Sequence, residues 1–148
     1  MDPLSLQNLM THFKNQIAEI NKTWMVINDS HVGNILSEVS IEDNMFLVGI
    51  LPVYGTDAEN SDNFRTVTYG QFLIVEKTDY GNLSQQDFID VFQRTFKVAE
   101  MIRNALIEYS AEKQCEFPYL MQLDINSLQM DAVYKLSECN GWSLEFEI

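Results

Sequence analysis

Two stretches near the carboxyl end alternate between apolar and polar residues, and this two-residue period constrains the fold more than any other feature. They are Leu128–Leu136 and Trp142–Ile148. Because successive side chains of a β-strand point to opposite faces, the alternation predicts two strands, each with one buried and one solvated face. Ser137–Gly141 lies between them and ends in an Asn-Gly turn pair, so we expect the two strands to form a hairpin.

A second hairpin is predicted in the middle of the chain. Asn44–Tyr54 is almost entirely apolar, which is typical of a buried central strand, and Pro52 marks a bend or an edge near its end. Arg65–Lys77 is rich in β-branched and aromatic residues and predicts the partner strand. Gly55–Asn63 between them is polar and acidic, so we expect a loop that gives the hairpin an extended, mobile tip. Two shorter stretches also predict strands, Trp24–Ile27 and Phe117–Ile125, the latter begun by Pro118.

Two amphipathic helices are predicted, over residues 3–21 and 85–113. Asp2 is a suitable N-cap with Pro3 at the first helical position, and Ser84 with Asp87 resembles a capping box. The core stripe of the second helix is expected to be Phe88, Phe92, Phe96, Ala99, Ile102 and Leu106. Residues 28–43 are compatible with a helix or a loop. The pattern predicts a single α+β domain over residues 1–148, with the helices packed on a mostly antiparallel sheet.

The charge and the cysteine content exclude several classes of function. Twenty-two acidic residues against nine basic ones give a net charge of −13, and such a surface repels nucleic acid and anionic membranes. Two interpretations fit this charge. It can keep the protein soluble at high concentration, or it can form an acidic surface that keeps DNA away or mimics it. The two cysteines, Cys115 and Cys139, form no CxxC motif, and the amino end does not resemble a signal peptide. Without an export signal or an apolar run long enough to span a membrane, we expect a cytoplasmic protein.

The motifs that commonly carry chemistry are missing from the sequence. Neither His12 nor His31 has a cysteine or aspartate at metal-ligand spacing. Asp57, Glu59 and Asp62 cluster in the acidic loop, but an EF-hand counted from Asp57 would place Asp62 and Thr68 where it requires glycine and glutamate. A weak divalent-ion site is the alternative to a solvated acidic loop. We therefore expect no catalytic residue, metal or cofactor, and a protein that is not an enzyme.

Interaction residues are predicted at three places. The first is the acidic loop, with Asp57, Glu59 and Asp62. The second is the basic side of the long helix, whose Arg94, Lys97 and Arg103 we expect to pair with acids of the same chain or of a neighbouring copy. The third is Trp142, an aromatic anchor after the last turn. The apolar face of the long helix is wide, which suggests burial by its own sheet and by a neighbouring subunit.

The order of the elements points to one family. A first helix is followed by a hairpin with a long polar tip, a long helix, and two closing strands that end in Gly141-Trp142-Ser143-Leu144-Glu145-Phe146-Glu147-Ile148. In this order and in its last strand the chain resembles the tail-terminator and tail-completion proteins of tailed phages and prophages. The resemblance implies a structural protein that forms a six-membered ring, caps the tail tube and docks to other tail or connector proteins. In such a ring the loop Asp57–Asp62 would line the lumen and let DNA pass without binding it.

A second class of function fits the charge equally well. A small acidic binding protein, such as an immunity protein, an antitoxin or a DNA mimic, would act as a monomer or dimer on one basic partner. Long-range electrostatic attraction would steer that association.

Overall fold

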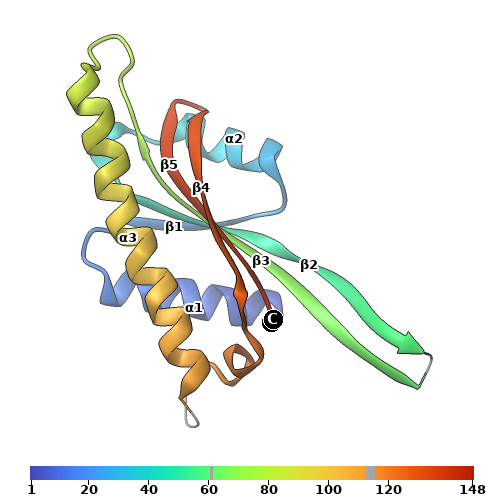
Figure 1. Ribbon diagram of the computed structural model, residues 1–148. Coiled ribbons are helices and arrows are strands. Elements are labelled where there is room, and N and C mark those ends of the chain that lie inside the picture. The colour runs from blue at the N-terminus through green and yellow to red at the C-terminus, as the bar shows by residue number, and fades with distance from the viewer. Residues whose placement is uncertain (61, 113–115) are drawn as a thin grey trace.

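The computed structural model describes residues 1–60, 62–112 and 116–148, and these form an α+β fold, as predicted (Figure 1). Its five-stranded sheet has the order β1-β2-β3-β5-β4, in which β1 is parallel to β2 and the other neighbours are antiparallel. The strands are β1 (Lys22–Val26), β2 (Phe46–Asn60), β3 (Asn63–Lys77), β4 (Asp124–Leu136) and β5 (Cys139–Glu147). The helices are α1 (Pro3–Gln16), α2 (Asp29–Glu38) and α3 (Gln85–Ala111), with short 3-10 helices at Ile41–Asp43 and Pro118–Gln122.

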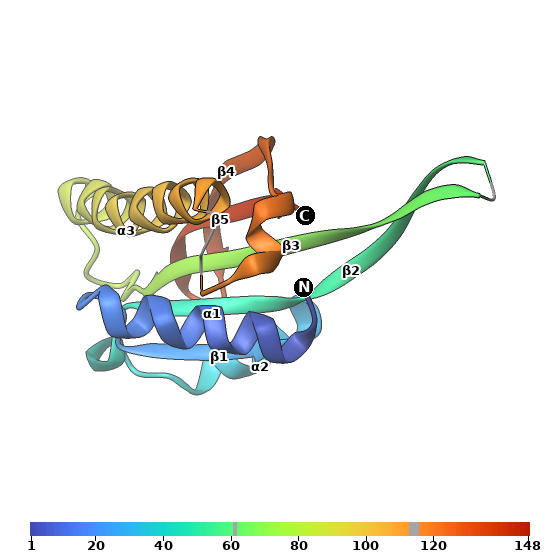
Figure 2. The ribbon, with the colours of Figure 1, turned by 90° about the horizontal axis from the view of Figure 1, so that it is seen from below.

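The helices cover both faces of the sheet and create two cores. On one face, α1 and α3 pack over residues such as Phe72 and Leu144 (Figure 2). On the other face, α2 contributes Val32 and Leu36 to a smaller core with Val48. This smaller core also includes Val75 of β3 and Cys139 of β5.

The helix ends follow the expected capping chemistry. Asp2 accepts a hydrogen bond from the Ser5 amide at 2.7 Å, and Ser84 forms the predicted capping box with Asp87. The first helix ends at Gln16 rather than at residue 21. Beyond it the chain is no longer helical, although Ile17 and Ile20 still enter the core. Apolar periodicity predicted this burial correctly but overestimated the length of the helix.

The undecided stretch 28–43 contains α2 and a 3-10 turn. Asn28 caps α2 by accepting a hydrogen bond from the His31 amide at 3.1 Å. The turn that follows α2 is closed by a capping box between Ser40 and Asp43. Because both devices are made by short polar side chains, the polar composition of this stretch is compatible with helical structure.

The prediction of a loop over Gly55–Asn63 was wrong. β2 continues to Asn60 and β3 begins at Asn63, with Asp57 opposite Arg65 and Ala58 opposite Phe64. Asn60 closes the turn, since its side-chain oxygen accepts hydrogen bonds from the amides of Asp62 and Asn63 at 3.0 Å. The strands are solvated on both faces here, so the segment lacks the apolar signature by which a strand is recognised in a sequence.

Three further predictions need correction. Phe117–Ile125 is a 3-10 helix followed by the start of β4, because Pro118 begins a helical turn that buries Leu120. The turn of the last hairpin is shorter than Ser137–Gly141, since β5 already begins at Cys139. In α3 the fully buried residues are Val91, Thr95, Val98, Ala99, Ile102 and Leu106, while the three phenylalanines of the predicted stripe are only half-buried.

The central hairpin extends far beyond the sheet. β1 pairs with β2 only as far as Ile50, and the pairing of β3 with the carboxyl-terminal strand ends at Thr68. Residues 53–60 of β2 therefore pair with β3 alone and residues 63–67 of β3 pair with β2 alone, and we call this two-stranded projection, residues 53–60 and 63–67, the arm. In both ribbon views the arm points away from the body of the protein (Figures 1 and 2).

Candidate interaction site

The arm exposes large apolar side chains on both of its faces. Val53, Tyr54 and Phe64 are 66%, 52% and 65% exposed, and Tyr69 at the base of the arm is 50% exposed. Val53 and Tyr69 are opposite each other on one face, whereas Phe64 lies on the other face opposite Ala58. Because at least half of each of these side chains is exposed, the arm presents an apolar surface to any molecule that lies against it.

The predicted acidic residues belong to this arm. Asp57 forms an ion pair with Arg65 at 3.0 Å, and Arg65 also approaches Glu147 at 3.7 Å. Asp62 is exposed at the turn. The side chain of Glu59 lies outside the described part of the chain. The acidic residues are thus held on a paired ribbon and not on a flexible loop.

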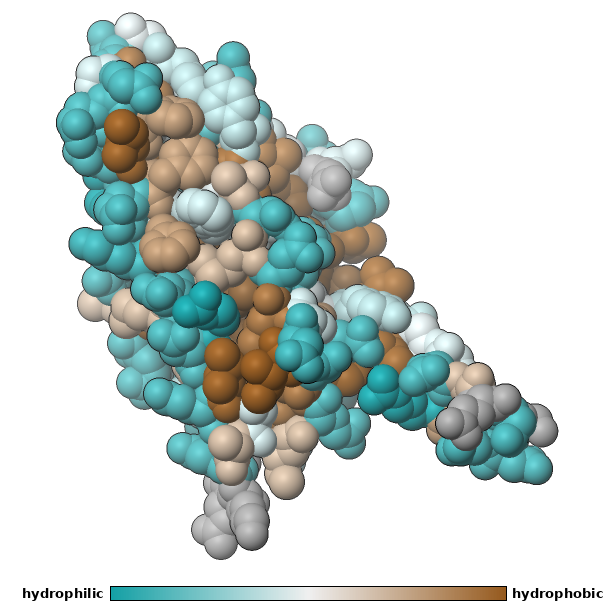
Figure 3. Space-filling model, viewed as in Figure 1, coloured by the Kyte–Doolittle hydropathy of each residue, from teal (hydrophilic) through white to brown (hydrophobic). Residues whose placement is uncertain are grey.

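Aromatic side chains from three elements form a second surface, which we call the aromatic strip. They are Phe88, Phe92 and Phe96 of α3, Tyr134 of β4 and Trp142 of β5. The ring centroids of Phe88 and Tyr134 lie 6.1 Å apart, and those of Phe96 and Trp142 lie 5.3 Å apart. The indole Nε1 of Trp142 donates a hydrogen bond to the Phe92 carbonyl at 3.0 Å. In the space-filling view, apolar side chains gather between α3 and the last two strands (Figure 3).

The strip is partly exposed because α3 does not cover the edge of the sheet. The helix crosses β5 and β3, so the face of β4 beside it is only partly shielded, and Tyr134 is 63% exposed. The alternation of the sequence assigned Tyr134 to a buried face. The Tyr134 side chain does point to the face that carries α3. It stays exposed because β4 lies at the edge of the sheet, where the helix only partly covers that face.

The basic side of α3 is largely neutralised within the chain. Arg94 forms an ion pair with the buried Glu76 at 2.7 Å, and this hydrogen bond raises the pKa of the guanidinium. Arg103 pairs with Glu100 one turn earlier, at 3.4 Å. Lys97 is exposed and, within the ranges that the structure describes, forms no ion pair. Arg94 and Lys97 line a separate hollow beside Met45, so the predicted interaction residues do not converge on one site.

Each of the two histidines contacts other side chains or backbone groups of the fold. The imidazole of His12 lies 2.8 Å from the hydroxyl of Tyr109, and its other nitrogen is 3.5 Å from the carboxylate of Glu116. The sequence separation of 97 residues hides the first of these contacts from any local motif. Nδ1 of His31 accepts a hydrogen bond from the Ile27 amide at 3.4 Å. No group of three or more metal-ligating side chains occurs among the described residues.

Comparison with protein-family models finds no matching family, and comparison with curated proteins finds no match. In the described part of the chain, no helix combines the length and the apolar character that crossing a membrane requires. The structure therefore defines the protein by its architecture: an α+β body with a projecting apolar arm and a partly exposed aromatic strip.

Proposed function

We propose that this protein is a non-enzymatic structural protein of a phage or prophage tail or neck, and that its copies form a ring that ends the tail tube and joins it to the head. The observation that carries the proposal is the arm. A two-stranded ribbon is marginally stable in water by itself, and its unpaired strand edges attract other chains. An arm with several exposed apolar side chains is best explained as part of an assembly.

A ring requires two different surfaces on each subunit. Cyclic assemblies larger than a dimer form when one patch of a subunit meets a different patch of the next. The arm and the aromatic strip are two such patches, and they belong to different elements. A ring of chains that each carry a charge of −13 would also repel DNA, so a genome would pass its channel without adhering.

The mass of the native assembly tests this proposal. We expect a species near six times the 17.1 kDa chain in native mass spectrometry, together with ring-shaped particles with an open centre in electron micrographs. The concentration series should extend from micromolar to millimolar, at low and moderate salt. A monomer at every concentration contradicts self-assembly.

The same acidic charge supports a second candidate, a binding protein that neutralises one basic partner. Twenty-two acidic residues against nine basic ones favour fast, electrostatically steered association. A monomer that binds a basic nuclease or toxin tightly, and loses that affinity as salt is raised, would favour this candidate over the ring.

A further inference from the structure

We infer that the arm of one copy lies across the aromatic strip and the edge strand β4 of the next copy. The inference rests on the proposed function, since it presumes that copies of this chain assemble, and it names the two surfaces that meet. It also places the arm against a neighbouring subunit, not in the lumen of the ring.

The arm and the strip of one molecule do not meet. The arm extends from the ends of β2 and β3 away from the body, whereas α3 lies on the opposite side of the molecule (Figures 1 and 2). A contact between the two surfaces would therefore join two different chains. Because the two surfaces differ, repeated contact between them propagates from subunit to subunit and closes into a ring when the rotation allows.

Both surfaces present apolar side chains that are incompletely covered. The arm exposes Phe64 on one face and Val53 on the other. At the end of the strip, Tyr80, Phe88 and Tyr134 line an open hollow of about 330 Å³. Exposed apolar patches of this kind commonly mark interaction surfaces, and aromatic residues are enriched where protein interfaces bind most strongly.

The backbones of the two surfaces are also complementary. β4 pairs with β5 alone, so its outer edge has no strand beside it among the described residues. In the arm, residues 53–60 likewise bond only to β3, and residues 63–67 bond only to β2. Strand edges of this type join by backbone hydrogen bonds when one chain adds a strand to the sheet of another.

One charge on each surface has no ion-pair partner among the described residues. Asp62 is exposed at the turn of the arm, whereas Asp57 is already paired with Arg65. Lys135 lies near the end of β4, with its ammonium group 5.2 Å from the centre of the Tyr80 ring. Five of the described basic residues pair with a carboxylate, namely Lys22, Arg65, Lys77, Arg94 and Arg103. Lys135 forms no such pair within the described part of the chain, which leaves its charge available to Asp62 of a neighbouring copy.

Two single substitutions test the contact from its two sides. Phe64→Ser removes an apolar side chain from the arm, and Tyr134→Ser removes one from the strip. Ile27→Ser is the matched control, because Ile27 is 64% exposed but belongs to neither surface. All three side chains are exposed, so each variant should keep the wild-type circular dichroism spectrum of the folded chain.

Native mass spectrometry over the concentration series is the measurement. We expect each test variant to raise the concentration for half-assembly by about tenfold or more, while the control assembles like the wild type. A mixture of the two test variants should form dimers, because the intact arm of Tyr134→Ser can bind the intact strip of Phe64→Ser.

The possible failures are distinguishable. A wild-type protein that stays monomeric contradicts the proposed function, and this inference with it. A wild-type ring that both test variants form as readily as the control contradicts the arm-to-strip contact alone and leaves the ring. If the variants fail to assemble but their mixture forms no dimer, the contact is also refuted, because the two surfaces are then not partners.

Discussion

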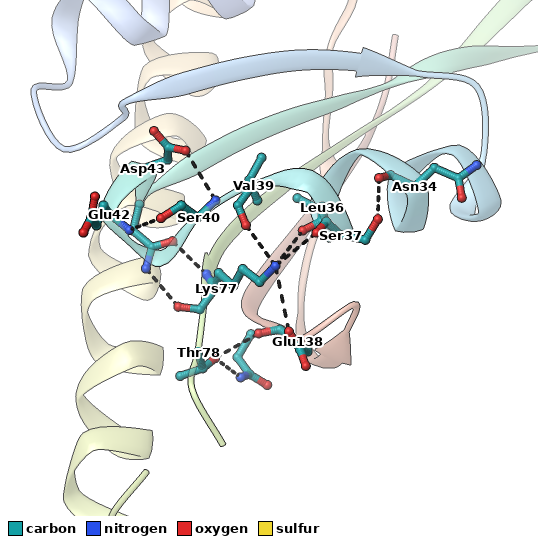
Figure 4. A network of polar contacts seen from close by, with 12 residues as sticks. Asn34, Leu36, Ser37, Val39, Ser40, Glu42, Asp43, Lys77, Thr78 and Glu138 are labelled. Atoms are coloured by element: carbon teal, nitrogen blue, oxygen red, sulfur yellow. Dashed lines mark hydrogen bonds and ion pairs between the residues drawn. The ribbon is translucent and has the colours of Figure 1, made fainter. Parts of the chain in front are cut away.

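The partly buried ammonium group of Lys77 should make a measurable contribution to stability. Lys77 projects from β3 to the carboxyl end of α2 (Figure 4). Its Nζ donates hydrogen bonds to the carbonyls of Val39 at 2.9 Å and of Leu36 and Ser37 at 3.4 Å, and it lies 3.8 Å from the carboxylate of Glu138. The side chain is only 14% exposed. One cation therefore serves several carbonyls that the last turn of a helix leaves unpaired.

The size of the effect follows from three contributions. A hydrogen bond to a charged group contributes about 1.5–3 kcal/mol, and a cation at a partly buried helix end adds up to about 2 kcal/mol. Removing the ammonium group also removes its desolvation cost, which opposes these gains. For Lys77→Met, which keeps the aliphatic stem, we expect a loss of about 2 kcal/mol. In a chain of this size such a loss lowers Tm by roughly 4–8 °C.

Urea unfolding followed by circular dichroism is the assay. Lys97→Met is the matched control, because Lys97 is exposed and lacks an ion pair within the described ranges, and its stability should change by less than about 0.5 kcal/mol. The m-value, which is the slope of the unfolding free energy against urea concentration, should be the same in both variants as in the wild type. Equal stability of Lys77→Met and the wild type, or equal losses in the two variants, would refute the reasoning.

Two further predictions concern β5. Gly141 has a φ of +158°, and an added Cβ would collide with the carbonyl oxygen of Ile74. In urea unfolding, Gly141→Ala should therefore lose about 3 kcal/mol or more of stability. The control Gly81→Ala, at an exposed turn, should lose less than about 0.5 kcal/mol. Burial raises the pKa of the Cys139 thiol to about 12, so in a Cys115→Ser background Ellman's reagent at pH 8 should label the protein only after urea unfolds it. Rapid labelling of the folded protein would contradict this burial. Because the thiol ionises at lower pH in the unfolded chain than in the folded one, the free energy of unfolding should also fall as pH rises from 9.0 toward 12.

Local patterns determined most of the secondary structure. Alternation within β4 and β5 predicted the closing hairpin, because a period of two residues is produced by the strand itself and needs no knowledge of neighbours. Short polar side chains predicted the starts of α1 and α3, since Asp2 and Ser84 bond to amides within the same turn. The class of fold follows from these local signals, and so does the burial of Ala99, Ile102 and Leu106 in α3.

The candidate surfaces were decided by the tertiary structure. The outer part of the arm escaped the sequence because its described side chains beyond Gly55 are solvated on both faces, and only the pairing of Asp57 with Arg65 and of Ala58 with Phe64 makes it a ribbon. The aromatic strip joins residues from α3, β4 and β5, and its exposure depends on β4 lying at the edge of the sheet. A sequence reports which side of a strand is apolar. The strand order and the reach of the helices, which are set by contacts between distant residues, decide whether that side is covered.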